Sequence, residues 1–286
     1  MPNASLDQEY LRSWIGRSET VNDVIDAPKA VAMAATLDVA WAPSGADTLP
    51  PLWHWIYFWS ANPMSMLGPD GHAQRGGFLP PVALPRRLWA GGRLQFLAPL
   101  MIGQQAQRIS TIKAVELKQG KSGPLVFVTV AHDVCVGGTI VLREEHDIVY
   151  REAPSATDAA APAKPAPADA QWSMQIEPDA VQLFRYSALT FNGHRIHYDR
   201  SYANKVEGYP GLIVHGPLIA TLLTELIRRE LPDRKIVEFS FRALSPVFDT
   251  APFSVHGNLS HDGGNVALWA ANGQGALAVQ AQARLA

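Results

Sequence analysis

The residue types that can do chemistry gather in one stretch of the chain, residues 185–223. Three histidines and a glycine that precedes a proline stand there: His194, His197, His215 and Gly216. Imidazole changes charge near pH 6.5, so such a residue can take up a proton and return it at neutral pH. Proline favours the first turn of a helix, whose N–H groups attract a developing anion. The pattern offers proton transfer beside an oxyanion site, although a lone histidine is more often a hydrogen-bonded core residue.

The same histidines do not predict a metal site. His194 and His197 are three residues apart, a spacing that aligns two rings only on a helix, Arg195 lies between them, and no third carboxylate ligand is near. The single cysteine, Cys135, lies in an apolar segment and is expected to be a buried small side chain rather than a nucleophile. The paired glycines stand outside any dinucleotide or nucleoside triphosphate motif. We therefore expect neither a metal nor a redox cofactor.

Composition excludes several classes of function. The net charge is −2 and only 17% of the 286 residues are charged, which provides no strong field for nucleic acid or an anionic membrane. No apolar run approaches the roughly 18 residues that span a bilayer, and the first residues lack the features of a secretory signal. One cysteine excludes an internal disulfide framework and fits a reducing compartment. We expect a soluble, cytoplasmic protein.

A composition break divides the chain. Residues 153–170 contain nine alanines and four prolines, and proline disfavours regular structure in itself and in the residue before it. We interpret this run as a linker between an N-terminal unit, residues 1–152, and a C-terminal unit, residues 171–286.

Both units are predicted to contain a helix followed by strands. In the C-terminal unit, residues 217–230 place apolar side chains three and four positions apart, which predicts a helix. An Ala-rich segment, residues 27–37, predicts the helix of the N-terminal unit. Turn residues separate the strand-like segments, which are residues 53–60, 94–98, 104–118, 125–136 and 139–151, then 235–244, 253–259, 265–271 and 276–285. The order predicts an α+β protein in which each unit wraps an antiparallel sheet round a helix.

Residues 185–223 resemble the (R)-specific enoyl-CoA hydratase, or MaoC-like, family of hotdog-fold proteins. Asn192 falls where that family has its catalytic aspartate, and His197 falls on its catalytic histidine, at the family's spacing of five. Asp199 and Ala203 match the trailing part of the motif, and Gly216 matches the glycine that opens the hotdog helix. Residues 76–104 resemble the N-terminal half of a double-hotdog subgroup that contains mesaconyl- and itaconyl-CoA hydratases and mitochondrial 3-hydroxyacyl-thioester dehydratases. The resemblance implies a double hotdog whose N-terminal unit encloses the substrate and whose C-terminal unit is catalytic.

The resemblance also implies a reaction. His197 would activate water for attack on the β-carbon of an enoyl-CoA, the Gly216 N–H would stabilise the enolate, and reprotonation of the α-carbon would complete hydration. Asn192 departs from the family, because an amide holds water or ligand by hydrogen bonds but cannot act as a carboxylate base. His197 would then carry most of the proton transfer.

Substrate contacts are harder to assign from the sequence. The subgroup suggests a short branched dicarboxylic substrate, whose distal charge requires a buried cation. The candidates for substrate contacts are Arg86, Arg87, Arg195, Asp199 and His215, although Asp199 is better explained as orienting nearby backbone. The aromatic run at residues 53–59 either lines an acyl pocket or belongs to the core.

Two other functions stay open. A thioesterase of the same fold would hydrolyse the thioester, and a non-catalytic acyl-CoA-binding protein would have lost the acid at Asn192. A fatty enoyl thioester is the alternative substrate, and a homodimer is the expected assembly.

Overall fold

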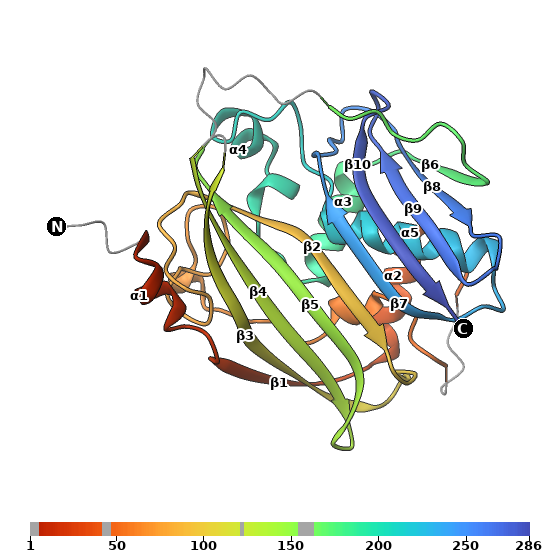
Figure 1. Ribbon diagram of the computed structural model, residues 1–286, viewed down its shortest axis with the longest axis horizontal. Helices are drawn as coiled ribbons and strands as arrows, with labels where there is room; N and C mark the ends of the chain where they lie inside the picture. Colours follow the sequence, from red (N-terminus) through yellow and green to blue (C-terminus); the bar gives the residue numbers. More distant parts are fainter. Residues whose placement is uncertain (1–5, 42–46, 121–122, 154–162) are drawn as a thin grey trace.

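One continuous antiparallel sheet runs through the molecule (Figure 1). The computed structural model describes residues 6–41, 47–120, 123–153 and 163–286. In this part of the chain ten strands pair in the order β1-β3-β4-β5-β2-β7-β10-β9-β8-β6. Their bounds are β1 (Ser18–Val24), β2 (Arg86–Phe96), β3 (Gln105–Gly120), β4 (Gly123–Val136), β5 (Thr139–Arg151), β6 (Trp172–Ile176), β7 (Ile236–Ala243), β8 (Phe253–Leu259), β9 (Asn265–Ala271) and β10 (Leu277–Leu285).

The two halves of this sheet have the same strand order. In each half the first strand, β1 or β6, forms an outer edge, and the second strand, β2 or β7, lies at the centre of the sheet. At the centre, antiparallel pairing of β2 with β7 joins the two halves into one sheet. Gly91 is required at this junction, because a Cβ there would lie 2.4 Å from the carbonyl oxygen of Phe241. The repeated order confirms the double hotdog predicted from the sequence.

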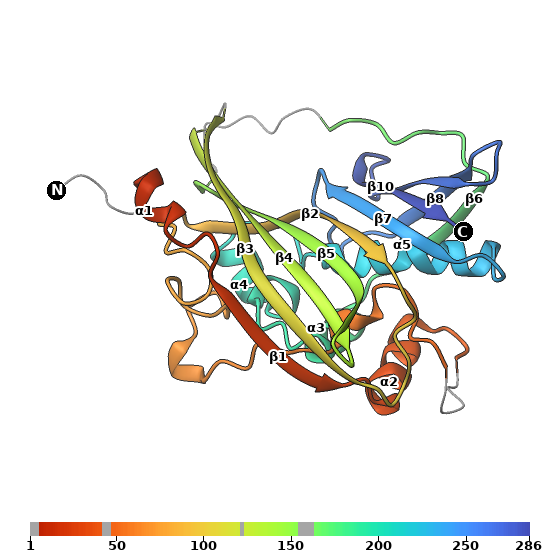
Figure 2. The same ribbon diagram turned by 60° about the horizontal axis from the view of Figure 1, so that its bottom comes forward.

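The helices lie on one side of the sheet (Figure 2). They are α1 (Gln8–Arg12), α2 (Ala27–Leu37), α3 (Ala180–Leu189), α4 (Arg200–Lys205) and α5 (Gly216–Glu230), with 3₁₀ turns η2 (Trp53–Ile56), η3 (Met64–Met66) and η4 (Arg195–His197). The helix α5 contains an almost unbroken run of buried residues and packs on the C-terminal strands. Asp26 caps the N-terminus of the helix α2, because its carboxylate accepts a hydrogen bond from the backbone N–H of Lys29. Both helices confirm the sequence predictions.

Part of the C-terminal half packs against the N-terminal half. The helix α3 packs against α2, and the Gln182 side chain donates a hydrogen bond to the Thr36 carbonyl at 3.4 Å. One apolar core joins the two halves and includes Met33 of α2, Trp53 of η2 and Leu223 of α5. As a result, the segment that follows α3, which carries the hydratase-like motif, lies against N-terminal residues.

The strand predicted at residues 53–60 is wrong. This segment forms the 3₁₀ turn η2 between two residues with left-handed backbone conformation, Leu52 and Phe58. A strand would alternate buried and exposed side chains, whereas Trp53, Ile56 and Tyr57 are all at most 1% exposed. The sequence prediction also missed the edge strands β1 and β6 and the helix α3, and it began β2 eight residues too late.

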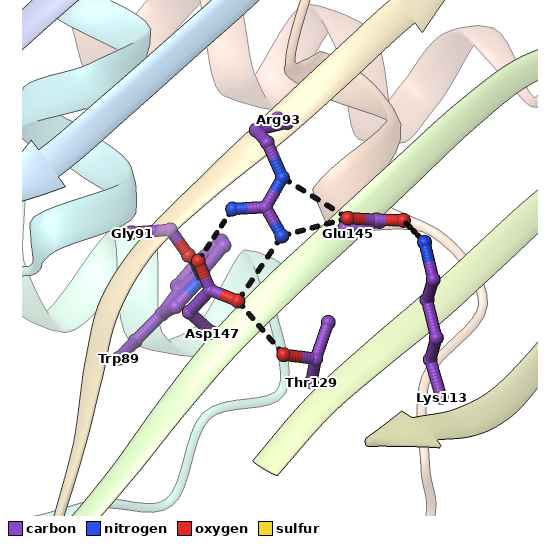
Figure 3. Close-up of polar contacts among 7 residues, drawn as sticks. All are labelled: Trp89, Gly91, Arg93, Lys113, Thr129, Glu145 and Asp147. Carbon is purple, nitrogen blue, oxygen red and sulfur yellow. Dashed lines mark hydrogen bonds and ion pairs between the residues drawn. The ribbon is translucent and has the colours of Figure 1, made fainter. Parts of the chain in front are cut away.

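The outer face of the N-terminal half carries charged side chains (Figure 3). Arg93 on β2 forms ion pairs with Glu145 at 2.7 Å and Asp147 at 2.6 Å, both on β5. Lys113 on β3 also pairs with Glu145, and Thr129 on β4 donates to Asp147 at 3.0 Å. These contacts connect four adjacent strands and favour their observed register.

The boundaries of the predicted units stay a prediction. Residues 154–162 of the proposed linker lie outside the described part of the chain. Of the remaining linker, the Lys164 carbonyl accepts a hydrogen bond from Leu277, and the Ala166 N–H donates to Gly275. No helix among the described residues is long and apolar enough to cross a bilayer.

Candidate active site

His197 is a buried, neutral histidine with a defined tautomer. It ends the turn η4, and 7% of its surface is exposed. Its Nδ1 lies 2.7 Å from the carbonyl oxygen of Ile213. Since a carbonyl only accepts hydrogen bonds, Nδ1 carries the hydrogen and Nε2 is the nitrogen that can accept a proton. Burial lowers the pKa of His197 to about 4, so the neutral form predominates at physiological pH.

His215 stacks on one face of the His197 ring and links that ring to the start of α5. The two rings stack with centroids 3.7 Å apart and an interplanar angle of 18°. His215 is fully buried, and its Nε2 hydrogen-bonds to the Ser187 hydroxyl of α3 at 2.8 Å. It also occupies the N-cap of α5 without capping the helix through its side chain. The first N–H of α5, on Gly216, is therefore next in sequence to a residue that contacts His197.

Asn192 forms the turn that leaves α3. Its backbone N–H donates to the Ser187 carbonyl at 2.8 Å, and its Oδ1 accepts from the backbone N–H of His194 at 3.1 Å. The Nδ2 group has no part in these two bonds. Asn192 also lines a cavity between the two halves, so its side chain can offer amide hydrogens to a bound molecule.

A cavity of about 1080 Å³ lies between the two halves. Its walls come from α3, from the segment between residues 60 and 79, from Arg87 on β2, and from the inner face of β4 and β5. His197 and Gly216 are not in the wall. The His197 ring centroid lies 5.4 Å from that of His194, which lies 4.0 Å from that of His72, a wall residue.

The predicted arginines have different surroundings. Arg86 forms a salt bridge with Glu207 at 3.2 Å and donates a hydrogen bond to the Tyr209 hydroxyl at 2.9 Å. Arg195 touches the cavity, but it is held by Asp199 at 2.8 Å. Arg87 lines the cavity, and no carboxylate among the described residues forms a salt bridge with it.

Two of the predicted substrate contacts serve local structure. Asp199 caps α4 by accepting a hydrogen bond from the backbone N–H of Tyr202 at 3.0 Å. This matches the expectation that it orients nearby backbone. His215 is enclosed between His197 and Ser187, and neither His215 nor Asp199 belongs to the cavity wall. The aromatic run at residues 53–59 is likewise absent from the wall, and most of it belongs to the core.

Sequence reasoning missed a second polar pair in the wall. The Nδ1 of His72 lies 2.9 Å from the carboxylate of Asp70, and the His72 ring packs against that of His194. Ligand atoms of Asp70, His72 and His194 lie within 4.8 Å of one another, so these three residues could hold a metal ion. The first two stand more than 110 residues before the motif, and only their order, Asp-x-His, signals a pair in the sequence.

A buried carboxylate on β5 was also missed. Glu144 is 4% exposed and accepts hydrogen bonds from His54 at 2.9 Å and Trp55 at 2.8 Å, and it contacts His146. Burial by itself raises the pKa of a carboxyl group, but His146 and His54 hold that of Glu144 well below its usual range. His146 also lines the cavity, so this cluster supports the wall opposite α3.

Comparison with known proteins decides between the classes of protein that share this fold. The model of the hydroxyacyl-thioester dehydratase type 2 family matches residues 52–249. The chain belongs to this family. The mesaconyl-C(4)-CoA hydratase of Chloroflexus aurantiacus is 52% identical over 245 residues, which cover 84% of this chain and 86% of the relative. The mitochondrial hydroxyacyl-thioester dehydratase type 2 of Schizosaccharomyces pombe is 30% identical over 240 residues, which cover 73% of this chain and 77% of the relative.

A solved MaoC-like dehydratase from Phytophthora capsici has the same fold as this dehydratase-family chain. It aligns with a TM-score of 0.73 over 98% of both chains, at 14% identity. The resemblance found in residues 185–223 is thus confirmed at the level of family and fold. The chain is an enzyme of the hydratase and dehydratase class, and the roles of its single residues stay predictions.

Proposed function

We propose that this chain catalyses the reversible hydration of an enoyl-CoA thioester, with a short branched dicarboxylic acyl group such as mesaconyl or itaconyl. The observation that carries the proposal is the state of His197. It is a neutral imidazole whose Nδ1–H is bound by the Ile213 carbonyl and whose Nε2 is left to accept a proton. This is the form that a base for water activation requires.

The proposed mechanism assigns one task to each group. The Nε2 of His197 takes a proton from water while the hydroxide adds to the β-carbon. Charge develops on the thioester oxygen, and the uncapped first turn of α5, beginning at Gly216, supplies N–H groups and a favourable dipole there. Asn192 orients water or substrate through its amide hydrogens. A proton delivered to the α-carbon completes the addition.

The dicarboxylic substrate is supported by Arg87. A second carboxylate in a largely apolar cavity is costly unless a cation meets it. Arg87 lines the cavity and has no ion pair to a described residue, and a guanidinium binds a carboxylate in a bidentate manner. The 52% identical relative is named for a mesaconyl-CoA substrate, which supports the same choice. A fatty enoyl thioester is the alternative substrate, and the 30% identical relative is named only as a hydroxyacyl-thioester dehydratase.

A panel of enoyl-CoA thioesters tests the function. Mesaconyl-, itaconyl- and crotonyl-CoA would each be mixed with the enzyme, and loss of the conjugated thioester absorbance would be followed. We expect loss of absorbance without release of free thiol, fastest with a dicarboxylic substrate. Release of thiol would indicate a thioesterase, and binding without turnover would indicate an acyl-CoA-binding protein.

We further propose that the enzyme works as a homodimer in the cytoplasm and needs no metal or redox cofactor. The single cysteine fits a reducing compartment and excludes a cysteine-rich zinc site. Light scattering on the purified chain, activity after chelation and cell fractionation test these three points separately.

A further inference from the structure

Two arginines of the cavity wall have no carboxylate partner among the described residues. Arg75 and Arg87 both line the cavity, and neither forms a salt bridge with a carboxylate in this part of the chain. Arg195 of the same wall, by contrast, is held by a carboxylate at 2.8 Å. Glu19, an acid of the wall, interacts with the charge of Arg108 on β3 instead. The positive charge of Arg75 and Arg87 is therefore suited to an anion that enters the cavity.

Both arginines lie next to the same tyrosine, Tyr150 on β5. The Cζ of Arg75 is 5.8 Å from the centroid of the Tyr150 ring. Arg75 is fixed there because its guanidinium donates hydrogen bonds to backbone carbonyls of the segment before β2, those of Val82, Leu84 and Pro85. Arg87 is the second residue of β2 and stands directly opposite Tyr150 in the antiparallel register. Side chains that face each other in this way share one face of the sheet, here the face toward the cavity.

Tyr150 has a buried hydroxyl without a hydrogen-bond partner. The residue is 0% exposed, and its ring packs in an apolar cluster with Val82 and Val128. Its hydroxyl oxygen meets no described donor or acceptor at hydrogen-bond distance and angle. Burial raises the pKa of this hydroxyl and the charge of Arg87 opposes the rise, so the guanidinium lies close to it. A buried polar group that stays unpaired costs stability, which indicates that the hydroxyl is retained for a function.

We propose that Tyr150 is a positioning residue, which orients Arg87 to bind the second carboxylate of a dicarboxylic substrate. This role rests on the proposed hydratase function and deepens it. A carboxylate that binds Arg87 from the cavity in a bidentate manner fixes the plane of the guanidinium. A remaining N–H of Arg87 then donates to the Tyr150 oxygen, which gains the partner that it lacks in the free protein. Arg75, held by backbone carbonyls, adds a second positive charge beside the bound carboxylate.

The two arginines also lie within electrostatic reach of the motif. The second carboxylate of a mesaconyl or itaconyl group is only a few bonds from the reacting carbons, so its binding site must be near the motif. Burial lowers the pKa of His194 to about 2, and Arg87 is among the charges that add to this change. Burial also lowers the pKa of His72, which packs on His194 at 4.0 Å, and Arg87 and Arg75 add to that change while Asp70 opposes it. A carboxylate on Arg87 is therefore placed at the end of the cavity where a short acyl group reacts.

The test removes the hydroxyl alone, in Tyr150→Phe. The ring stays packed and the hydroxyl has no partner in the free protein, so the midpoint of urea unfolding should stay at or above that of the parent. With the best dicarboxylic thioester of the panel we expect KM to rise about three- to tenfold and kcat to change less than about twofold. With crotonyl-CoA, which has no second carboxylate, KM should keep the parent's value. Tyr10→Phe, at an exposed tyrosine of α1 outside the cavity, is the matched control.

Two further measurements separate this role from others. In an Arg87→Gln background, Tyr150→Phe should raise KM for the dicarboxylic thioester by less than about twofold, because the hydroxyl acts through Arg87. Saturated thioesters cannot be hydrated, so their binding gives a readout that needs no turnover. By isothermal titration calorimetry, Tyr150→Phe should weaken the binding of methylsuccinyl-CoA about three- to tenfold and leave that of butyryl-CoA unchanged.

Each other outcome decides against a specific statement. A Tyr150→Phe variant with the parent's KM and affinity for the dicarboxylic compounds would overturn the role of Tyr150 and leave the hydratase function standing. An equal loss with both classes of thioester, or a full loss that persists in the Arg87→Gln background, would also overturn it, since the hydroxyl would then serve the CoA portion or the fold. A parent enzyme that turns over no thioester of the panel would refute the proposed function, and the affinities for methylsuccinyl-CoA and butyryl-CoA would still decide for or against Tyr150.

Discussion

At the scale of single residues, a dyad of aspartate and histidine usually combines a free imidazole nitrogen with a carboxylate partner. In this site the two belong to different residue pairs. His197 has the free nitrogen of a base, but its Nδ1 bonds to a backbone carbonyl rather than to a carboxylate. The carboxylate lies elsewhere, on Asp70, and it holds another histidine. The motif itself therefore places no carboxylate on His197, and the carboxylate in the cavity wall comes from the N-terminal half.

Replacing His197 by alanine should reduce kcat by about 10²–10⁴-fold with a modest change in KM, because the base for water activation is lost. The low pKa adds a prediction for the parent enzyme. Since the neutral form persists down to about pH 4, the acid limb of its pH profile should lie well below the pH 6.5 of an ordinary histidine. Steady-state kinetics from pH 4 to 9 would measure both, and an acid limb near pH 6.5 would contradict the assignment.

Replacing Asn192 by aspartate should impair turnover and move the pH optimum upward. The carboxylate can still accept from the His194 N–H, so the turn after α3 is retained. The variant loses the amide donor, however, and a negative charge near His197 raises the pKa of that histidine. Kinetics at several pH values on the parent and the variant would measure the change. A variant faster than the parent at neutral pH would indicate that Asn192 marks a decayed dyad.

Replacing Arg87 by glutamine should discriminate between substrates. With a dicarboxylic thioester the variant loses a charge-assisted contact, which is equivalent to about a tenfold or larger rise in KM. With crotonyl-CoA, which has no second carboxylate, KM should change little. Arg143→Gln, an exposed arginine of β5 outside the cavity, is the control. An equal rise for both substrates would assign Arg87 to the CoA portion instead.

The motif residues were predictable from the sequence because their spacing is local. The positions from Asn192 to His197 fall in one short segment, and the glycine that opens α5 follows in the same stretch. Asp70 and His72 were not predictable, because their place beside His194 depends on the close contact of Gly71 with Gly193. The choice of Arg87 over Arg86 also needed the structure, since the two are neighbours in sequence and only packing shows that Glu207 occupies Arg86.

At the scale of secondary-structure elements, the sheet is supported differently on its two faces. The inner face of β5 carries Glu144 in a buried cluster with histidine and tryptophan, whereas the outer face carries Glu145 and Asp147 in exposed ion pairs. Buried charge is costly to leave unpaired, while exposed pairs contribute little.

Replacing Glu144 by alanine should therefore lower the free energy of unfolding by about 3–5 kcal/mol, because it leaves buried donors of Trp55 and His54 without an acceptor. Glu145→Ala, the next residue along β5, should cost less than about 1 kcal/mol. Because the pKa of Glu144 in the folded state lies below that of the unfolded chain, its contribution is present above about pH 4.3 and is lost as pH falls further. Denaturant titrations of both variants at pH 7 would measure the difference, and equal costs would contradict this account.

The elements that the sequence predicted best are those with regular patterns. The strands β5, β8 and β9 and the helix α2 have the predicted bounds, and α5 begins one residue earlier than predicted. The aromatic run of η2 was mistaken for a strand because its residue types favour strands, while its conformation is set by burial on several sides. The edge strand β1 was missed because its sequence, SETVNDV, is mostly polar, as suits a strand with one unpaired edge.

At the scale of the whole molecule, the two halves behave as one structure. The sequence predicted two copies of one fold, and the strand order confirms it, but the pairing of β2 with β7 and the passage of α3 beneath the N-terminal half depend on long-range contacts that periodicity does not encode. The cavity shows the functional result, because its wall combines Asn192 from one half with His72 and Arg87 from the other. A cavity with this wall exists only while both halves are folded together.

The chain should accordingly unfold in a single cooperative transition, although proteins of this length often unfold domain by domain. The main core includes Met33 and Trp53 from the N-terminal half together with Leu223 from α5, so neither half buries this surface alone. Leu223→Ala should lower the free energy of unfolding by about 2–5 kcal/mol and move the entire transition to lower temperature. Scanning calorimetry would measure this, with equal calorimetric and van't Hoff enthalpies expected for the parent. Two resolved peaks, of which the variant shifts only one, would show that the halves unfold independently and that the shared core contributes little to their coupling.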